Sequence, residues 1–261
     1  MKNRIDEAFK KKPIFMPYFP LGYPDLDTSI DVIEALAENG ADLVEVGLSF
    51  SDPLADGPVI QKATQVALEK GITVKKSLAA VAELRRRGVT IPLILMGYYN
   101  PMLAYGLERF VCDAAEAGAD GFIIPDLPME EAEEFISAAG ADRDPPLPLI
   151  QMLAPTSSPE RMESIARNAK GFIYLVSVTG VTGERKSVAD DLGQLIARVR
   201  EHTSVPVCVG FGISTPEQAK QVGALAEGVI VGSACVKTIG GSENPVETAK
   251  QFAAEFRRAL S

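Results

Sequence analysis

Short apolar runs rich in branched aliphatic residues alternate with longer segments of helical pattern along the chain. The runs are apolar at nearly every position, which is typical of parallel strands buried on both faces, whereas a half-exposed antiparallel strand would alternate. Strands that alternate with helices in this way predict an α/β fold, the (β/α)8 TIM barrel. Eight strands are expected, at residues 14–19, 43–47, 92–96, 121–125, 149–153, 172–176, 207–209 and 228–231.

The segments between these runs carry the signals of helix starts and ends. Residues 215–218, Thr-Pro-Glu-Gln, have the pattern of a capping box, and Ser158 followed by proline opens another helix. Two segments are near copies, EALAENGADLVEVG and CDAAEAGADGFIIP, each with a glycine that ends a helix before a buried strand. This repeat of the βα unit favours a single domain over residues 1–261. An extra helix is expected at residues 4–10, before the first strand.

Length and composition fit one barrel without a membrane segment. The chain has 261 residues, close to the roughly 250 of a typical barrel of this kind. No apolar run approaches the ~18 residues of a membrane span. Residues 1–12 lack the apolar stretch of a secretory signal, so we expect a cytoplasmic protein. A net charge of −9 argues against nucleic acid or an anionic membrane as the main partner.

The residues that commonly bind metals are few and far apart. Cys112, Cys208 and Cys235 lie in separate apolar segments, which predicts reduced thiols in the core instead of disulfides or a metal cluster. The single histidine, His202, precedes the seventh strand at the end of the barrel away from the expected chemistry, where a surface role is typical. No metal site is therefore expected.

Two carboxylates stand out in the sequence VEVGLSFSDPLADGP, residues 44–58. Glu45 lies inside an apolar strand, and a carboxylate that faces a barrel interior loses its hydration, so its presence indicates chemistry. Asp56 follows in a loop rich in proline and glycine. A turn or a helix cap is an equally good interpretation of Asp56 taken alone.

Aromatic residues gather near the carboxyl ends of the expected strands, where barrels of this type carry their active sites. A group of aromatic side chains at one face suits a flat apolar ligand, although each residue taken singly also fits ordinary packing. The group comprises Tyr18, Phe19, Tyr98, Tyr99, Tyr174 and Phe211.

Glycine-rich loops follow the last three strands, at residues 180–183, 210–214 and 232–233. Glycines allow the backbone to approach an oxyanion, and the short helix expected at residues 234–238 would add the partial positive charge of its N-terminus. This is the usual phosphate site of the barrel. It would allow an acidic protein to bind a phosphoester through backbone N–H groups.

The lack of certain residue types at the strand ends limits the reactions that the site could catalyse. A Schiff-base aldolase needs a strand-end lysine, but Lys170 precedes its strand, and Lys186 and Lys237 fall in a loop and a helix. The remaining site has two carboxylates, an aromatic slot and a phosphate cradle. General acid–base chemistry without a metal or cofactor is the resulting prediction.

The motifs resemble the tryptophan synthase alpha subunit family over almost the whole chain, in the order PYFPLGYPD, VEVGLSFSDPLADGPVIQ, LMGYYNP, GFIIPDLP, VTGVTG, GFGIS and VGSACVK. The string FSDPLADGP is very specific to that family. The resemblance implies a lyase that cleaves indole-3-glycerol phosphate to indole and D-glyceraldehyde 3-phosphate, in the last steps of tryptophan biosynthesis.

The resemblance also implies a role for each matching position. Glu45 matches the carboxylate that moves protons, and Asp56 matches the carboxylate that holds the indole N–H. The substrate-contacting positions would be Tyr18, Tyr98, Tyr174, Thr182 and Phe211, with Thr182 bonding Asp56 when its loop closes; the phosphate ligands would be Gly183, Gly212, Gly232 and Ser233.

The resemblance further implies a beta subunit, a PLP-dependent partner in an α2β2 complex, which faces residues 51–56 and the turn at 100–101. PLP would belong to that partner, because no strand-end lysine could hold it here. Pro20, Ser49 and Val178 depart from the commoner pattern of the family, and the first two bear on pocket shape and partner contact. A synthase or isomerase barrel of the same pathway lacks support, since it needs a lysine or another acid–base pair. A non-catalytic regulatory subunit remains an alternative.

Overall fold

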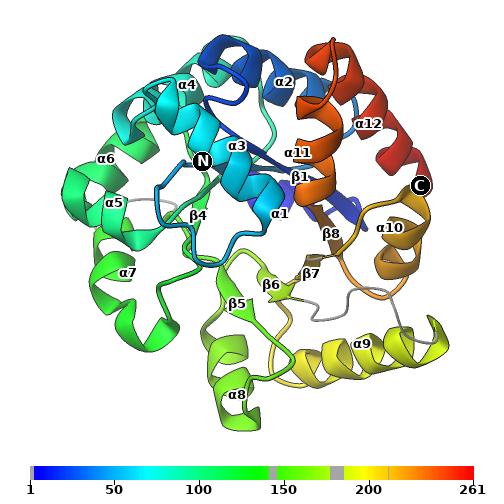
Figure 1. The fold of residues 1–261 in the computed structure, drawn as a ribbon. Helices are drawn as coiled ribbons and strands as arrows, with labels where there is room; N and C mark the ends of the chain where they lie inside the picture. Colours follow the sequence, from blue (N-terminus) through cyan, green and yellow to red (C-terminus); the bar gives the residue numbers. More distant parts are fainter. Residues whose placement is uncertain (1–2, 141–145, 177–184, 211) are drawn as a thin grey trace.

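The computed structural model describes residues 3–140, 146–176, 185–210 and 212–261, and its centre is a parallel barrel (Figure 1). In these residues eight strands pair in the order β4-β3-β2-β1-β8-β7-β6-β5, so the first and last strands of the chain are neighbours. The strands are β1 (Ile14–Pro20), β2 (Val44–Gly47), β3 (Leu93–Met96), β4 (Gly121–Ile123), β5 (Gln151–Leu153), β6 (Ile173–Val176), β7 (Val207–Gly210) and β8 (Gly228–Val231). All eight expected strands are confirmed.

The barrel closes between β4 and β5 through a short contact instead of a full ladder. Phe122 and Leu149 form an isolated parallel bridge. The Phe122 N–H donates to the Pro148 carbonyl at 2.9 Å, and the Ile150 N–H donates to the Phe122 carbonyl at 2.8 Å. These bonds satisfy backbone groups that an open sheet edge would leave unpaired.

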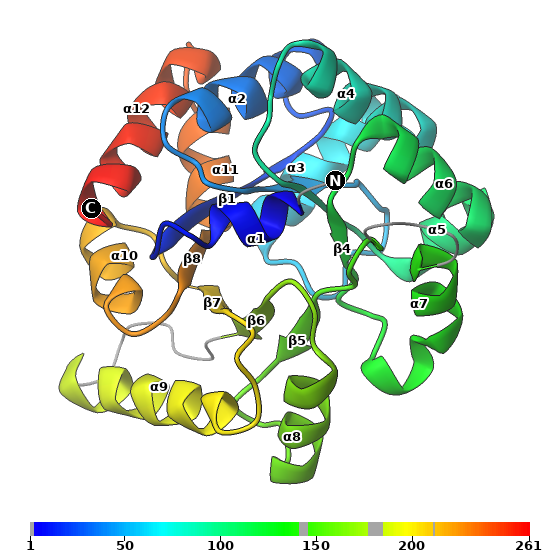
Figure 2. The same cartoon turned by 180° about the vertical axis from the view of Figure 1, so that it is seen from behind.

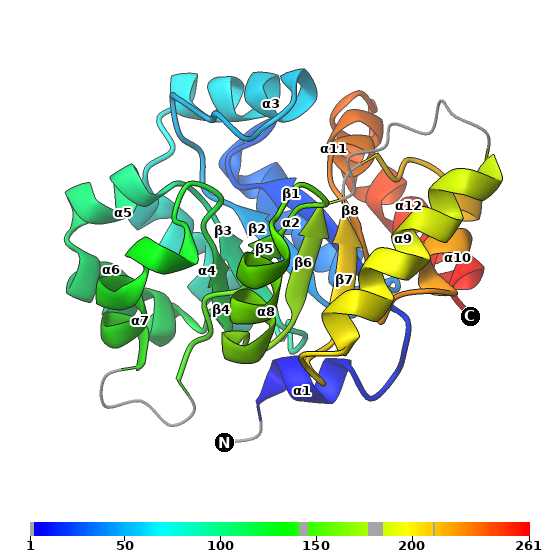
Figure 3. The same ribbon diagram turned by 90° about the horizontal axis from the view of Figure 1, so that it is seen from below.

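Helices surround the barrel and cover its outer face (Figures 1 and 2). They are α1 (Arg4–Ala8), α2 (Leu26–Glu38), α3 (Pro58–Glu69), α4 (Val74–Arg86), α5 (Tyr99–Tyr105), α6 (Leu107–Ala117), α7 (Glu133–Gly140), α8 (Pro159–Asn168), α9 (Arg185–Arg200), α10 (Pro216–Gly223), α11 (Ser233–Gly240) and α12 (Pro245–Ala259), with a 3-10 turn η1 (Met129–Glu131). The expected extra helix is α1. Figure 3 shows α1 beyond one end of the barrel and α3 beyond the other.

Local signals in the sequence explain where several helices begin and end. Thr215 and Gln218 form the expected capping box at the start of α10, and the Ser158 side chain caps α8 by accepting from the Arg161 N–H. Gly118 ends α6 in the left-handed conformation with φ 91°, which a residue with a Cβ adopts only at a cost.

The cysteine prediction is right for two residues and wrong for the third. Cys208 and Cys235 are buried free thiols, whereas Cys112 is exposed. Cys112 lies on α6 beside the buried residues Phe110 and Val111, and a helix that buries these neighbours turns position 112 outward. None of the helices in the described residues is long and apolar enough to cross a membrane.

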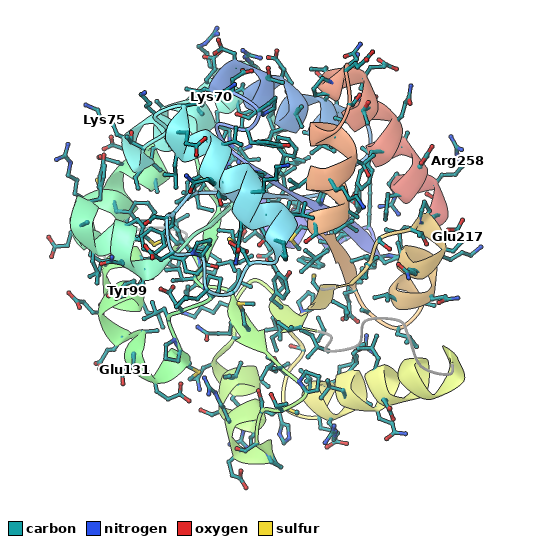
Figure 4. The ribbon with its side chains drawn as sticks, viewed as in Figure 1. Lys70, Lys75, Tyr99, Glu131, Glu217 and Arg258 are labelled. Atoms are coloured by element: carbon teal, nitrogen blue, oxygen red, sulfur yellow. The ribbon has the colours of Figure 1, made fainter. Side chains whose placement is uncertain are left out.

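Charged side chains lie on the outside of the helix layer. Figure 4 shows Lys75, Glu131, Glu217 and Arg258 at the periphery of the molecule. A charged group therefore needs a specific reason to lie inside the helix layer, because it would lose hydration there. The carboxylate of Asp120 is one such group at the end of the barrel that α1 covers.

Asp120 joins three elements through one carboxylate. Its side chain is only 8% exposed and pairs with Arg85 of α4 and with Arg4 of α1. The Leu93 N–H at the start of β3 donates to the same carboxylate at 2.8 Å. The carboxylate thus compensates the buried Arg85 guanidinium, whose own side chain is 13% exposed.

Replacing Asp120 by alanine should lower the free energy of unfolding by about 3 kcal/mol, because Arg85 and the Leu93 N–H lose a buried partner. The control is Asp31→Ala, which removes an exposed partner of Arg87 and should cost less than about 1 kcal/mol. Urea denaturation of both variants measures the difference. Equal losses would contradict a special role for Asp120.

Candidate active site

One cavity opens at the carboxyl ends of the strands, where the sequence places the two candidate carboxylates. Seven of the eight strands contribute residues to its wall, and the loop after the remaining strand, β7, contributes three more. They are Tyr18, Glu45, Ala55, Asp56, Gly57, Ile60, Met96, Ile123, Pro125, Met152, Tyr174, Gly212, Ile213, Ser214, Ile230, Gly232, Ser233 and Ala234. Its wall is therefore mostly apolar, with a few polar groups, as in sites for small molecules.

Glu45 is a buried carboxyl group that faces this cavity. Its position in β2 is fixed by parallel pairing with Tyr18 of β1 and Ile94 of β3, and the residue is 3% exposed. Among the described residues, Glu45 has no hydrogen-bond or ion-pair partner. Burial, and secondarily the nearby charge of Asp56, raises the pKa of Glu45 to about 8. Glu45 therefore carries a proton at neutral pH.

Asp56 lies in the loop between β2 and α3 and is less buried than Glu45. Its N–H donates to the Pro53 carbonyl at 3.0 Å, and its own carbonyl accepts from the Gln61 side chain at 2.8 Å. The N-cap of α3 is Gly57, with no side-chain bond, so Asp56 is not a helix cap. Burial raises the pKa of Asp56 to about 6, while a hydrogen bond from Tyr98 opposes this rise. Asp56 is therefore mostly ionised at neutral pH.

Tyr18 and Tyr174 form two sides of the cavity next to Glu45. Burial, with both carboxylates close by, raises the pKa of each phenol far above its usual value, so both stay neutral. A Cβ at Gly47 would lie 2.3 Å from the Tyr18 hydroxyl oxygen, and one at Gly210 would lie 2.5 Å from that of Tyr174. Glycine at these two strand ends makes room for the tyrosine rings.

Tyr98 does not line the cavity, although the sequence placed it among the substrate contacts. Its hydroxyl oxygen accepts a hydrogen bond from the Ala55 N–H at 2.9 Å, and the hydroxyl bonds the Asp56 carboxyl group. Tyr98 therefore lies behind Asp56. The sequence alone could not decide whether Tyr98 faces the cavity or the loop, because Tyr98 follows β3 at the same end of the barrel as the residues that line the cavity.

The glycine-rich end of the cavity has the features of an anion site. Gly212 has φ 80°, and Gly232 is the N-cap of α11 without any side-chain cap bond. Ser233 and Ala234 begin α11 and line the cavity, so the unpaired N–H groups of the first turn lie at its edge. Gly212, Gly232 and Ser233 thus come together as expected.

Three of the expected contacts, Thr182, Gly183 and Phe211, lie outside the described residues, as does the departure at Val178. The other departures have defined places. Pro20 pairs with Gly47 at the end of β1, and the Ser49 hydroxyl donates to the Leu21 carbonyl at 3.5 Å.

Sequence reasoning missed most of the apolar wall. These residues come from α3, from β3, β5 and β8, and from the end of β4 and the loop after it: Ile60, Met96, Ile123, Pro125, Met152 and Ile230. The sequence of a strand that is apolar throughout does not reveal which of its residues face inward. The pairing of the strands in the structure does reveal it: Met152 lies opposite Tyr174, which faces inward, so Met152 faces inward too.

The arrangement supports proton transfer to a flat apolar ligand that carries an anionic group. Glu45 holds a proton, Asp56 holds a negative charge, and the cavity wall around them is mostly apolar. Among the described residues, no group of three or more His, Cys, Asp or Glu side chains could hold a metal ion.

Comparisons with known proteins point to one family. The family model "Tryptophan synthase alpha chain" matches residues 6–260. The tryptophan synthase alpha chain of Chloroflexus aurantiacus is 48% identical over 263 residues, covering 99% of this chain and 97% of the relative. The alpha chain of Chloroflexus aggregans is 49% identical over 239 residues, covering 90% of this chain and 88% of the relative.

Solved structures give the same result. The aminoacrylate-bound tryptophan synthase of M. tuberculosis includes a chain that superimposes with a TM-score of 0.88 at 33% identity, covering 100% of both chains. Tryptophan synthase subunit alpha from Legionella pneumophila str. Paris gives a TM-score of 0.88 at 35% identity, covering 100% of this chain and 99% of that chain.

The electrostatic link between the two carboxyl groups can be measured directly. In Asp56→Asn the pKa of Glu45 should fall below about 8, since the repelling charge is gone, but stay above 4.5, since burial persists. Carbon-13 NMR titration of the Glu45 carboxyl group in both proteins measures the shift. An unchanged pKa would show that Asp56 is too distant to act on Glu45.

Proposed function

The chain belongs to the tryptophan synthase alpha chain family, and we propose that Glu45 and Asp56 are the groups with which it carries out the reaction of that family. The enzyme is a lyase of tryptophan biosynthesis that cleaves indole-3-glycerol phosphate into indole and D-glyceraldehyde 3-phosphate. The observation that carries the assignment is the buried, protonated carboxyl group of Glu45, which faces the cavity next to the ionised Asp56.

Glu45 moves two protons in sequence. Its carboxyl group, protonated below a pKa of about 8, donates a proton to C3 of the indole ring. The carboxylate that results then accepts the proton of the side-chain hydroxyl next to C3. As the aldehyde forms, the carbon–carbon bond breaks and its electrons return to the ring. Glu45 ends the cycle protonated, as it began.

Asp56 stabilises the charge that this proton transfer creates. Protonation at C3 places positive charge on the indole nitrogen, and a carboxylate that accepts the N–H hydrogen bond stabilises it. A pKa of about 6 keeps Asp56 ionised at neutral pH, while its partial burial strengthens the interaction. The two carboxyl groups thus have opposite protonation states for two different roles.

The rest of the cavity binds the substrate. Tyr18 and Tyr174 contact the indole side, with Phe211 as a further wall. Gly232 and Ser233 hold the phosphate through backbone N–H groups at the start of α11, and Gly212 contributes from the loop after β7. For Gly183 and Thr182, which lie outside the described residues, we propose the roles that the family resemblance implies: a phosphate ligand and a hydrogen-bond partner of Asp56.

Membership of this family implies a beta subunit as the partner, and PLP belongs to that subunit. We propose an α2β2 complex in which this chain has no cofactor of its own. Apolar side chains on the cavity side of the molecule support a partner surface there: Leu54 is 89% exposed and Leu103 is 45% exposed. Leu54 lies within segment 51–56, and Leu103 lies two residues after segment 100–101; the family resemblance assigns both segments to this contact.

We also propose that residues 1–261 act as one domain in the cytoplasm. The pairing of β1 with β8 supports the single domain, because it joins the two ends of the chain in one sheet. Three free cysteines are consistent with a reducing compartment.

Glu45→Gln should lower kcat for the release of indole from indole-3-glycerol phosphate by roughly 100-fold or more, because the amide cannot donate or accept the proton. The change keeps the side-chain volume, and the fold should persist because the wild-type group is already neutral. Indole and glyceraldehyde 3-phosphate are assayed without and with a beta subunit. A wild-type chain that activates the beta subunit but releases no products would instead support the non-catalytic regulatory alternative.

Leu54→Asp should weaken binding to the beta subunit by roughly 10- to 100-fold, since an exposed leucine that becomes buried would be replaced by a charge. Asn168→Asp adds the same charge at the end of α8, on the opposite end of the barrel, and should leave affinity unchanged. Titration calorimetry with the purified beta subunit compares the two. Equal affinities would exclude Leu54 from the interface.

A further inference from the structure

Tyr98 joins the end of β3 to the loop that carries Asp56. The residue is 3% exposed, and its hydroxyl oxygen accepts the Ala55 N–H at 2.9 Å. The same hydroxyl bonds the carboxyl group of Asp56. Because a phenol has one hydrogen, the hydroxyl accepts from the backbone of the loop and donates to the carboxylate.

Neighbouring residues fix the position of Tyr98, whereas the carboxylate of Asp56, unlike its backbone, has few contacts that hold it in place. Tyr98 is the N-cap residue of α5, and its ring lies 5.6 Å from that of Phe50, centroid to centroid. The next N–H along the chain, that of Tyr99, donates to Asp126 at 2.9 Å and fixes the backbone at this point. Among the described residues, no hydrogen bond other than that from Tyr98 reaches the Asp56 carboxylate.

We propose that Tyr98 is a positioning residue that holds the Asp56 carboxylate toward the indole N–H without touching the substrate. This inference rests on the role proposed for Asp56. One carboxylate oxygen accepts from Tyr98, and the other is free to accept from the substrate. The rigid strand end thereby fixes a catalytic group that lies on a loop, which preorganises the site.

The hydrogen bond from Tyr98 also tunes the charge of Asp56. It lowers the pKa of Asp56 against the effect of burial, which is the larger influence. Three other titratable groups face Asp56 across the cavity: Glu45 from β2, Tyr18 from β1 and Tyr174 from β6, each with its pKa raised in part by the Asp56 charge. At neutral pH these three groups are uncharged.

Loss of the Tyr98 hydroxyl should therefore raise the pKa of Asp56 above its value of about 6. Asp56 must be ionised to act, so activity falls as pH falls through its pKa. The acidic limb of the pH profile of kcat/KM, with its midpoint near 6 in the wild type, should move to higher pH.

The test compares Tyr98→Phe with the wild type, using indole-3-glycerol phosphate as substrate. We expect kcat to fall roughly tenfold, the size of one lost hydrogen bond, with KM changed less than about threefold and the acidic limb shifted upward. The control Tyr105→Phe removes a tyrosine hydroxyl that bonds Asp113 and does not line the cavity, so this variant should match the wild type. Circular dichroism establishes that both variants fold.

Several results would overturn the proposal. A rise in KM with unchanged kcat would mean that Tyr98 binds the substrate directly. A lower kcat with an unmoved acidic limb would mean a structural role only. A carbon-13 NMR titration of Asp56, which needs no activity, must show a higher pKa in Tyr98→Phe than in the wild type.

The Asp56→Asn background separates this proposal from the function assigned to the site. If Tyr98 acts through Asp56, Tyr98→Phe should change kcat by less than about twofold in that background. Full activity of Asp56→Asn alone would refute the role of Asp56 itself. Impaired Asp56→Asn together with unimpaired Tyr98→Phe would refute only the role of Tyr98.

Discussion

The desolvation of Glu45 is the constraint on which the site depends. A carboxyl group in the barrel interior has lost water and gains no compensating partner among the described residues, so its neutral form is favoured and its pKa is about 8. This state requires that no cation lies beside the carboxyl group, whereas the nearby negative charge of Asp56 favours it further. The tyrosines on either side remain un-ionised for the same reason, and glycines at Gly47 and Gly210 let their rings pack close to it. A buried cation beside Glu45 would lower its pKa and remove the proton that the reaction needs.

The two carboxyl groups differ because they lie on different kinds of structure. Glu45 is in the middle of a strand, where burial is nearly complete, and Asp56 is on a loop, where burial is partial and a phenol donates to it. The protein thus obtains an acid near pKa 8 and a carboxylate near pKa 6 from similar side chains. A loop gives less precise placement than a strand. The hydrogen bond from the Ala55 N–H to the hydroxyl oxygen of Tyr98, which follows β3, restrains this loop and so improves the placement of Asp56.

The barrel architecture could be predicted from the sequence because each strand is a short apolar run between segments with recognisable helix starts and ends, as in β2 and β8. The sequence identified Glu45 for a related reason, since one charge within such a run is conspicuous. Uniformly apolar strands conceal which residues face inward, and so Met96 and Met152 were missed. Side-chain direction at strand ends depends on neighbouring loops, which is why Tyr98 was assigned to the cavity and is found behind Asp56.

The overall charge of the protein bears on the proposal that the anion site is built from backbone N–H groups. A net charge of −9 repels a phosphoester at long range, although salt screens this repulsion beyond about 10 Å. Lysine or arginine side chains in the cavity would bind the phosphate strongly, but they would also lie near Glu45 and lower its pKa. The N–H groups at the start of α11 act only over a short distance, because their partial charges decay within one helical turn. The proposed backbone site would therefore hold the phosphate while leaving Glu45 protonated.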